Sequence, residues 1–196
     1  MRMSVAAIIV AAGASRRLGQ PKQLVIFDGE PLLQRAIQCA ISAGADPVFV
    51  VLGAHRQAIQ NVIDFGSAMV LVNVNWEEGL ASSIHAGVKA VDAGGAEPGG
   101  ALLMTCDQPR LTAEHLRKMI EQFDSQAGAV LIASVYSGVR GTPAIFPRAM
   151  FAELLTVRGD KGARGVLARA SLPVVEIELK GGEVDIDRPE DLAQLG

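Results

Sequence analysis

The chain has 196 residues, 49% of them hydrophobic and 20% charged, and a formal net charge of −3. This length fits one domain with a sizeable core, because single hydrophobic cores extend to roughly 200 residues or somewhat more. The slight acidic excess and the scattered basic residues argue against a general nucleic-acid binder, so any anion binds at a local site. We therefore expect a single domain over residues 1–196 that binds no nucleic acid.

The apolar start of the chain and its cysteines bear on location. Residues 1–11 are apolar after Arg2, but this run is too short to cross a membrane and lacks a secretory cleavage pattern. We expect a cytoplasmic protein without a membrane partner. Cys39 and Cys106 match no Cys-x-x-Cys spacing and the histidines are isolated, so neither a disulfide nor a zinc site is predicted.

Strands and helices are predicted to alternate along the chain. Continuous apolar runs predict buried strands at residues 6–10, 47–52, 69–74, 101–105, 129–135 and 174–179. Helical patterns and capping signals predict helices that begin near Pro31, His55, Ser82, Thr112, Phe151, Val166 and Pro189. Gly44 is expected to end the first helix, and Ser82 or Ser83 to cap the third.

Turn residues separate these elements, and the order of the elements predicts the fold class. We expect a surface loop at 94–100, a turn at 138–143 and a further extended piece at 183–186. Alternating strands and helices with short loops are typical of a mostly parallel α/β sheet with helices on both faces. The later strands follow one another closely, so the sheet is expected to become mixed. Ligands of such folds bind beyond the carboxyl ends of the strands.

The first predicted strand leads into a basic loop with small residues, 10–22. Small side chains let the backbone approach a ligand closely, and consecutive N–H groups can converge on anionic oxygens. Arg16, Arg17 and Lys22 add positive charge, and no acidic residue precedes Asp28. The composition favours a phosphate-binding loop, with an ordinary surface loop of solvated basic side chains as the alternative.

The same loop resembles a known signature. It is neither a Walker A motif nor Gly-x-Gly-x-x-Gly. Its sequence, Val-Ala-Ala-Gly-Ala-Ser-Arg-Arg-Leu-Gly-Gln-Pro-Lys, is similar to the Leu-Ala-Ala-Gly-x-Ser-x-Arg-Met-Gly-x-x-Lys of nucleotidyltransferases that act on molybdenum cofactor, with Val10 and Leu18 as departures. Residues 79–83 and 107–109 resemble the Gly-x-x-x-Ser and Asp-x-Pro motifs of the MobA-like NTP transferase family. Residues 140–143, 159–164 and 185–191 resemble motifs of its molybdenum cofactor cytidylyltransferase branch.

The resemblance implies a fold and a reaction. The fold would be a three-layer α/β/α, Rossmann-like arrangement of the nucleotide-diphospho-sugar transferase type. In the reaction, the terminal phosphate of molybdopterin cofactor would attack the α-phosphorus of CTP, and pyrophosphate would leave. Such chemistry needs positioning and charge neutralisation more than a strong general base. The implied cofactor is Mg²⁺, which prefers carboxylate and phosphate oxygens.

The resemblance also implies roles for individual residues. The catalytic residues would be Arg17, Lys22 and Asp107. The nucleotide would contact Val10, Ala11, Ala12, Gly13, Ser15, Arg16, Lys22, Gly79, Ser82 and Ser83. The acceptor would contact Arg140, Asp160 and Arg164, although a structural salt bridge is an alternative for each. The metal would be held by Asp107 and Asp187, with Asp185 as the alternative to Asp187.

Several alternatives stay open at this level. The Ala11-Ala12-Gly13 form and Gln108 resemble the cytidylyltransferase branch, whereas the family's guanylyltransferases usually carry Ala-Gly-Gly and Thr there. CTP is thus favoured over GTP. A second enzyme hypothesis replaces molybdopterin by a sugar phosphate or polyol phosphate. A third, non-enzymatic hypothesis is a module that delivers the finished cofactor to a recipient molybdenum enzyme.

Overall fold

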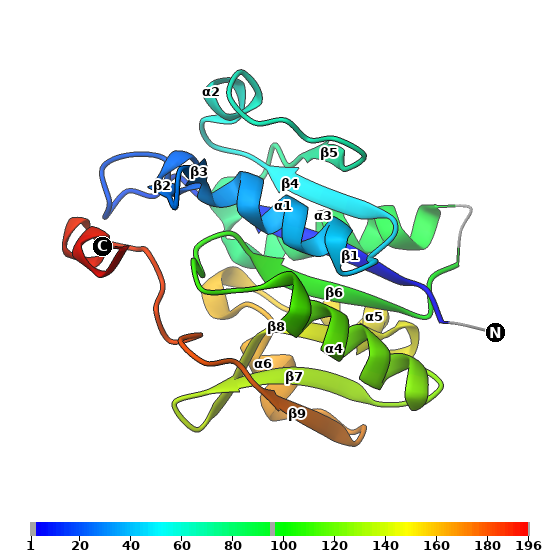
Figure 1. Cartoon of the computed structure of the whole chain (residues 1–196). Helices are drawn as coiled ribbons and strands as arrows, with labels where there is room; N and C mark the ends of the chain where they lie inside the picture. The colour runs from blue at the N-terminus through cyan, green and yellow to red at the C-terminus, as the bar shows by residue number, and fades with distance from the viewer. Residues whose placement is uncertain (1–2, 95–96, 196) are drawn as a thin grey trace.

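A seven-stranded sheet lies between two layers of helices in the computed structural model, which describes residues 3–94 and 97–195 (Figure 1). The strand order is β5-β4-β1-β6-β8-β7-β9. The strands are β1 (Val5–Ala11), β4 (Val48–Leu52), β5 (Met69–Val72), β6 (Gly100–Thr105), β7 (Leu131–Tyr136), β8 (Val139–Pro147) and β9 (Val174–Glu178). Within this sheet β8 is antiparallel to both neighbours and the other pairs are parallel. The expected mostly parallel sheet that becomes mixed is confirmed.

The central strand β1 explains the two layers. Successive side chains of a strand point to opposite faces of the sheet. Ile9 and its alternate neighbours therefore join one core cluster, and Ile8 joins the other, both fully buried. The first cluster is covered by α1 (Leu32–Ser42), α2 (Arg56–Gln60) and α4 (Ala113–Ser125), and the second by α3 (Leu80–Ala93), α5 (Phe151–Leu154) and α6 (Arg164–Ala168).

Short elements complete the chain. A two-stranded ribbon pairs β2 (Ile26–Phe27) with β3 (Glu30–Pro31). The 3-10 helices are η1 (Lys22–Leu24), η2 (Trp76–Glu78), η3 (Arg148–Met150), η4 (Gly159–Lys161) and η5 (Pro189–Leu195). Among the described residues no helix is long and apolar enough to cross a bilayer.

The strand order creates a crevice at the carboxyl end of β1. From β1 the chain builds β4 and β5 on one side, and then β6 is added on the other side of β1. Val10 pairs with Thr105, so the loops that follow β1 and β6 leave the sheet next to each other and diverge. Such a switch point is where ligands bind in open α/β sheets.

Two segments of the later chain differ from the expectation. The turn expected at 138–143 is confined to Ser137 and Gly138, and the remainder belongs to β8, because its backbone groups pair with β7 across a register shift between Ala133 and Ser134. The piece 183–186 is not a strand; it crosses the edge of the crevice.

The ends and lengths of the helices agree with the expectation only in part. Helix α3 begins at Leu80, so Ser82 and Ser83 lie inside its first turn and neither caps it; instead the Leu80 N–H donates to Asp160 Oδ1 at 3.3 Å. Gly44 follows the end of α1 with φ +90°, as expected for a residue after a helix end. The helical pattern that begins at His55 and continues to Ile63 forms a helix only over α2. The helix expected to begin near Pro189 is a 3-10 helix, and residues 95–96 of the expected loop lie outside the described residues.

Candidate active site

The loop after β1 lines a cavity of about 690 Å³, here called the loop cavity. Its floor is the carboxyl end of β1, and its other walls come from η2, the start of α3 and the end of β6. Of the residues implied by the resemblance it contains Val10, Ala11, Ala12, Gly13, Ser15, Arg16, Arg17, Lys22, Gly79, Ser83, Asp107, Asp160, Arg164 and Asp187. The fold thus gathers segments from both ends of the chain around one space.

Hydrogen-bond donors of the protein face the carbonyl groups of the loop and fix the orientation of its backbone. All four carbonyl oxygens of residues 11–14 face protein donors: Gln23 Nε2 donates to Ala11 O (2.7 Å) and Gly13 O (3.1 Å), the Ala54 N–H donates to Ala12 O (2.9 Å), and His55 Nε2 lies 3.3 Å from Ala14 O. The N–H groups of residues 12–17 have no acceptor in the part of the chain that the structure describes. A run of free N–H groups in a turn is a preformed site for anionic oxygens.

Gln23 supports the loop and is not among the residues predicted from the sequence. Its side chain is 1% exposed and bridges two carbonyls of the loop, which a buried amide can do because it carries two N–H donors. The signal available in the sequence was its position directly after Lys22, at the end of the basic loop. A polar side chain that is buried there must form hydrogen bonds with nearby groups.

Lys22 brings two distant carboxylates together. Its Nζ lies 2.9 Å from Asp107 Oδ2 and also contacts Asp187 Oδ1, while Arg17 Nη2 lies 3.0 Å from Asp187 Oδ2. Thr105 Oγ1 donates to the other oxygen of Asp107 at 2.5 Å. The acidic segment at the end of the chain therefore meets the basic loop, as its charge predicts.

The charges of this cluster shift its pKa values. Burial alone would lower the pKa of Lys22, but Asp107 and Asp187 outweigh it and hold the pKa well above its usual range. Burial would raise the pKa of Asp187, yet hydrogen bonding and attraction to Lys22, with help from Arg17, hold it below normal. Asp185 has a raised pKa, because of burial and then the neighbouring carboxylates. Asp187, not Asp185, shares Lys22 with Asp107.

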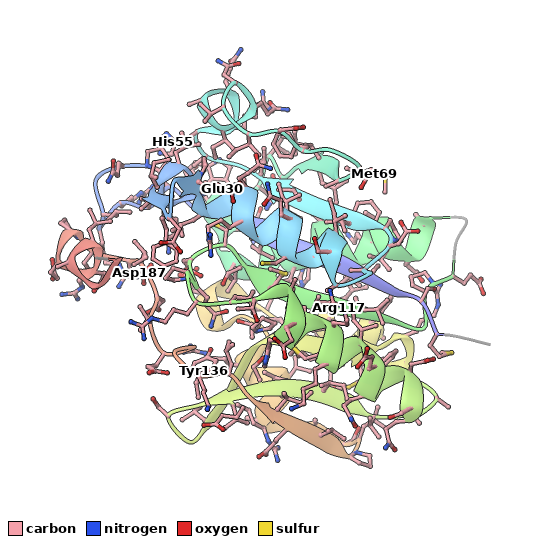
Figure 2. All side chains as sticks on the ribbon, in the orientation of Figure 1. Glu30, His55, Met69, Arg117, Tyr136 and Asp187 are labelled. Atoms are coloured by element: carbon pink, nitrogen blue, oxygen red, sulfur yellow. The ribbon has the colours of Figure 1, made fainter. Side chains whose placement is uncertain are left out.

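The path of the last segment decides which carboxylate reaches Lys22. Ile186 is fully buried in a small cluster with Leu18, Val25 and Leu32, and its N–H donates to Asp107 O at 3.1 Å. This anchor holds the segment against the carboxyl end of β6. Figure 2 shows Asp187 at that end of the sheet, the same end at which His55 and Tyr136 lie.

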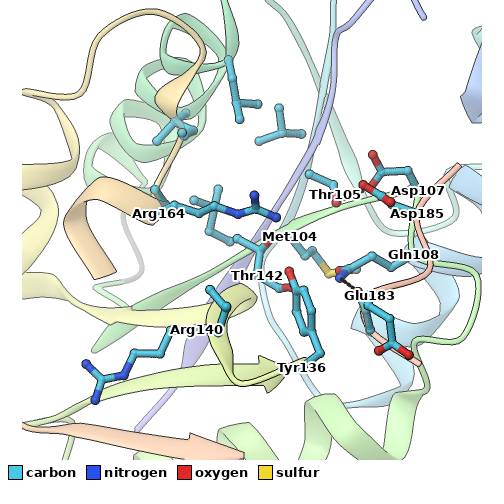
Figure 3. Close-up of a pocket in the computed structure, with 18 of the residues that line it drawn as sticks. Met104, Thr105, Asp107, Gln108, Tyr136, Arg140, Thr142, Arg164, Glu183 and Asp185 are labelled. Atoms are coloured by element: carbon cyan, nitrogen blue, oxygen red, sulfur yellow. Dashed lines mark hydrogen bonds between the residues drawn. The ribbon is translucent and has the colours of Figure 1, made fainter. Parts of the chain in front are cut away.

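A second cavity, of about 480 Å³, adjoins the loop cavity and is here called the Tyr136 cavity (Figure 3). Asp107, Asp160, Arg164 and Thr105 line both cavities. Figure 3 shows Arg164 extending into the space. Arg164 forms no hydrogen bond or ion pair with residues 3–94 and 97–195, so its guanidinium is free for a ligand.

Other predicted contacts are placed differently. Arg140 lines the Tyr136 cavity, but its Nε donates to Glu176 Oε1 at 2.6 Å, and Figure 3 shows the guanidinium turned away from the other labelled residues. Ser82 is not in the loop cavity; its hydroxyl accepts from Asn73 Nδ2 and lies 2.9 Å from Asn75 O. Gln108 lines the Tyr136 cavity and not the loop cavity, although the family resemblance links it to the choice of nucleotide.

The model of the MobA-like NTP transferase domain matches residues 7–174, which include the basic loop, the end of β6 and most of the Tyr136 cavity. The chain belongs to this family. It is a nucleotidyltransferase, and the family resemblance that the loop motif indicated is confirmed.

The nucleotidyltransferase is similar in sequence to several named proteins. It is 28% identical to purine catabolism protein PucB of Bacillus subtilis (94% of this chain, 92% of PucB) and 28% identical to nicotine blue oxidoreductase of Paenarthrobacter nicotinovorans (97% and 96%). It is also 25% identical to a probable molybdenum cofactor guanylyltransferase of Bacillus cytotoxicus, over 65% of this chain and 61% of that protein.

Solved structures confirm the expected fold class. The Rv0371c protein of Mycobacterium tuberculosis superposes with a TM-score of 0.83 at 26% identity, covering 100% of this nucleotidyltransferase and 98% of that chain. A second structure of Rv0371c, with a TM-score of 0.77 at 24% identity, covers 98% of this chain and 97% of its own and is a complex with manganese.

Proposed function

We propose that this nucleotidyltransferase transfers CMP from CTP to the terminal phosphate of molybdopterin cofactor, releasing pyrophosphate and forming the cytosine dinucleotide cofactor. One observation carries the proposal: a cavity with free backbone N–H groups and a second cavity meet at Asp107, beside Lys22 and Asp187. Two substrates that react with each other need two adjoining sites with the reacting atoms at their junction.

The loop cavity suits the triphosphate of the nucleotide. The free N–H groups of residues 12–17 provide donors for phosphate oxygens, and Arg16, Arg17 and Lys22 provide positive charge. Because the transition state of phosphoryl-type transfer is stabilised mainly electrostatically, these cations also stabilise the charge that develops on the departing pyrophosphate.

The carboxylates of Asp107 and Asp187 suit one divalent cation, for which Mg²⁺ is our choice. Both already face a single cation, the Lys22 ammonium, so their oxygens converge on one position. Within residues 3–94 and 97–195 no cluster of three or more His, Cys, Asp or Glu is placed to hold a metal. Mg²⁺ is commonly bound by one or two carboxylates together with substrate phosphates, which this donor set matches. When bound, the ion would neutralise phosphate charge at the junction of the cavities.

The Tyr136 cavity suits the acceptor. Arg164 extends into it without a partner among the described residues and can pair with a phosphate through two N–H donors. The second pKa of a phosphate monoester is about 6, so the attacking group is largely ionised at neutral pH without a strong base. This agrees with a junction built from Asp107, Lys22 and Arg164 and not from a histidine and its partner.

The choice of CTP rests on the loop. Its Ala11-Ala12-Gly13 form resembles the cytidylyltransferase branch, and Ala12 packs into the hydrophobic core directly beneath the loop. The relative named as a probable molybdenum cofactor guanylyltransferase supports molybdopterin cofactor as the acceptor, but it does not support CTP as the nucleotide. A recipient molybdenum enzyme would take up the product.

The experiment is pyrophosphate release from each of the four nucleoside triphosphates, with Mg²⁺ and molybdopterin cofactor as acceptor. We expect release with CTP and far less with GTP. Release with GTP alone would assign the protein to the guanylyltransferases. Release that requires a sugar phosphate or polyol phosphate would assign another acceptor, and cofactor binding without release would support the delivery module.

A further inference from the structure

The wall of the Tyr136 cavity opposite Arg164 contains a buried hydrogen-bond acceptor without a partner. Gln108 is 9% exposed, and its Nε2 donates to Gly182 O at 2.9 Å, which orients the amide. Its Oε1 is shielded from solvent and has no partner among the described residues. A buried polar atom without a partner costs free energy, so its presence in a cavity wall needs an explanation.

Glu183, an exposed residue, offers a second acceptor at the same cavity. It follows Gly182, lines the same cavity and forms no hydrogen bond or ion pair with the part of the chain that the structure describes. Figure 3 shows Gln108 between the Asp107–Asp185 pair and Glu183. Two acceptors on one cavity wall suit a ligand that presents more than one N–H donor.

A fixed aromatic ring stands next to these acceptors. A Cβ on Gly182 would lie 2.7 Å from Tyr136 Cδ1, and one on Gly141 would lie 2.2 Å from Tyr136 Oη. The Tyr136 ring therefore packs between two residues without side chains and its position is set. Met104 and Val139 continue this wall with apolar surface. A flat heterocycle fits such a wall, because aromatic and apolar side chains bind ring faces.

We infer that Gln108 Oε1 and the Glu183 carboxylate bind the 2-amino-4-oxo edge of the acceptor's pterin, with the ring against Tyr136. This edge presents N3–H and the 2-amino group side by side, a pair of donors that a carboxylate can accept as it accepts the fork of a guanidinium. The remaining amino hydrogen can go to Gln108 Oε1. The inference rests on the proposed function and adds the residues that distinguish a pterin from a sugar or polyol acceptor.

The inference is tested without turnover, by titrating the full-length protein with pterin and with lumazine and following ligand fluorescence. Lumazine has the same rings but a carbonyl in place of the 2-amino group. We expect pterin to bind about tenfold or more tightly than lumazine, because a site built for N–H donors rejects an analogue that lacks one. In Glu183→Gln the preference should fall severalfold, because the charged acceptor is lost while Gln108 Oε1 remains. Glu178→Gln, an exposed glutamate outside the Tyr136 cavity, is the matched control and should bind like the parent.

Gln108→Met provides a second variant, since it removes the acceptor and keeps the length of the side chain. It also removes the hydrogen bond to Gly182, so its thermal unfolding is compared with that of the parent. Equal binding of pterin and lumazine, or an unchanged preference in Glu183→Gln, would overturn the inference. The proposed function fails in a different experiment, if molybdopterin gives no pyrophosphate release from CTP. Release from CTP together with absent pterin selectivity would overturn the inference alone.

Discussion

Lys22 Nζ lies 2.9 Å from Asp107 Oδ2, although 85 positions separate the two residues in the chain. The two side chains are 17% and 18% exposed, so solvent screens this ion pair less than a surface pair. Asp187 adds a second carboxylate to the same ammonium. The relationship joins the loop after β1 to the end of β6 and to the last segment of the chain, and it places opposite charges where the two cavities meet.

Asp107→Asn should remove metal-dependent turnover and keep the fold. An amide is a weaker metal ligand than a carboxylate, and loss of one electrostatic contact of a transition state typically costs about 100-fold or more in rate. Pyrophosphate release at saturating Mg²⁺ measures the rate, and thermal unfolding checks the fold. Activity near the parent level would show that Asp107 is not a metal ligand.

The two acids of the last segment should behave differently. Asp187→Asn is expected to raise the Mg²⁺ concentration needed for half-maximal activity about tenfold or more, because Asp187 is a proposed ligand and even the loss of an outer-shell group at a metal site costs about tenfold or more. Asp185→Asn should raise it much less, because Asp187 and not Asp185 shares Lys22 with Asp107. The measurement is a Mg²⁺ titration of both variants in parallel. A larger effect of Asp185→Asn would reverse the assignment.

Lys22→Met should chiefly weaken binding of CTP. The variant loses a cation from the loop cavity and leaves Asp107 and Asp187 facing each other without it. We expect the KM for CTP to rise about tenfold, the loss typical of one charge-assisted contact. The KM for the acceptor is the internal control and should change little. An unchanged KM for CTP would make Lys22 a structural cation.

Gln23→Leu should disturb the loop that lines the loop cavity. It removes two buried hydrogen bonds, to Ala11 O and Gly13 O, and leaves both carbonyls without these donors. We expect unfolding free energy to fall by about 2 kcal/mol and the KM for CTP to rise. Urea unfolding and steady-state kinetics measure the two effects. Gln60→Leu, an exposed glutamine of α2, is the control; equal effects of both variants would contradict the role of Gln23.

His115 should make the fold sensitive to acid. Burial, and then Lys118, lowers the pKa of His115 in the folded protein to about 4, from 6.5. Between these values the unfolded chain binds the proton more readily than the folded protein. The contribution of His115 to the free energy of unfolding is therefore fully present above pH 6.5 and is lost as the pH falls toward 4. The loss amounts to about 3 kcal/mol.

The measurement is urea unfolding at several pH values for the parent and for His115→Gln. The variant keeps an N–H donor that can reach Ser134 Oγ, the partner of His115 Nε2 at 2.9 Å. Its stability should change less between pH 6.5 and pH 4 than that of the parent. Parallel curves for the two proteins would assign the acid sensitivity to other groups.

Many elements could be predicted because their causes are local. The apolar runs of β1, β4 and β6 are buried on both faces, and the spacing in α1 and α4 matches helices with one buried side. Turn composition was a weaker guide. Glycine, threonine and proline at 138–143 suggested a turn, but pairing with β7 makes residues from Val139 onward part of β8.

The sequence by itself determined the basic loop, its small residues and its likeness to the MobA-like NTP transferases, because these depend on residues next to each other in the chain. Tertiary structure alone decided that Lys22 lies between Asp107 and Asp187, that Gln23 turns the loop's carbonyls inward, and that Gln108 lines the Tyr136 cavity. Asp185 and Asp187 are alike in sequence; burial of Ile186 between them sets which carboxylate reaches the lysine. Such choices depend on how distant segments pack, and no local pattern encodes them.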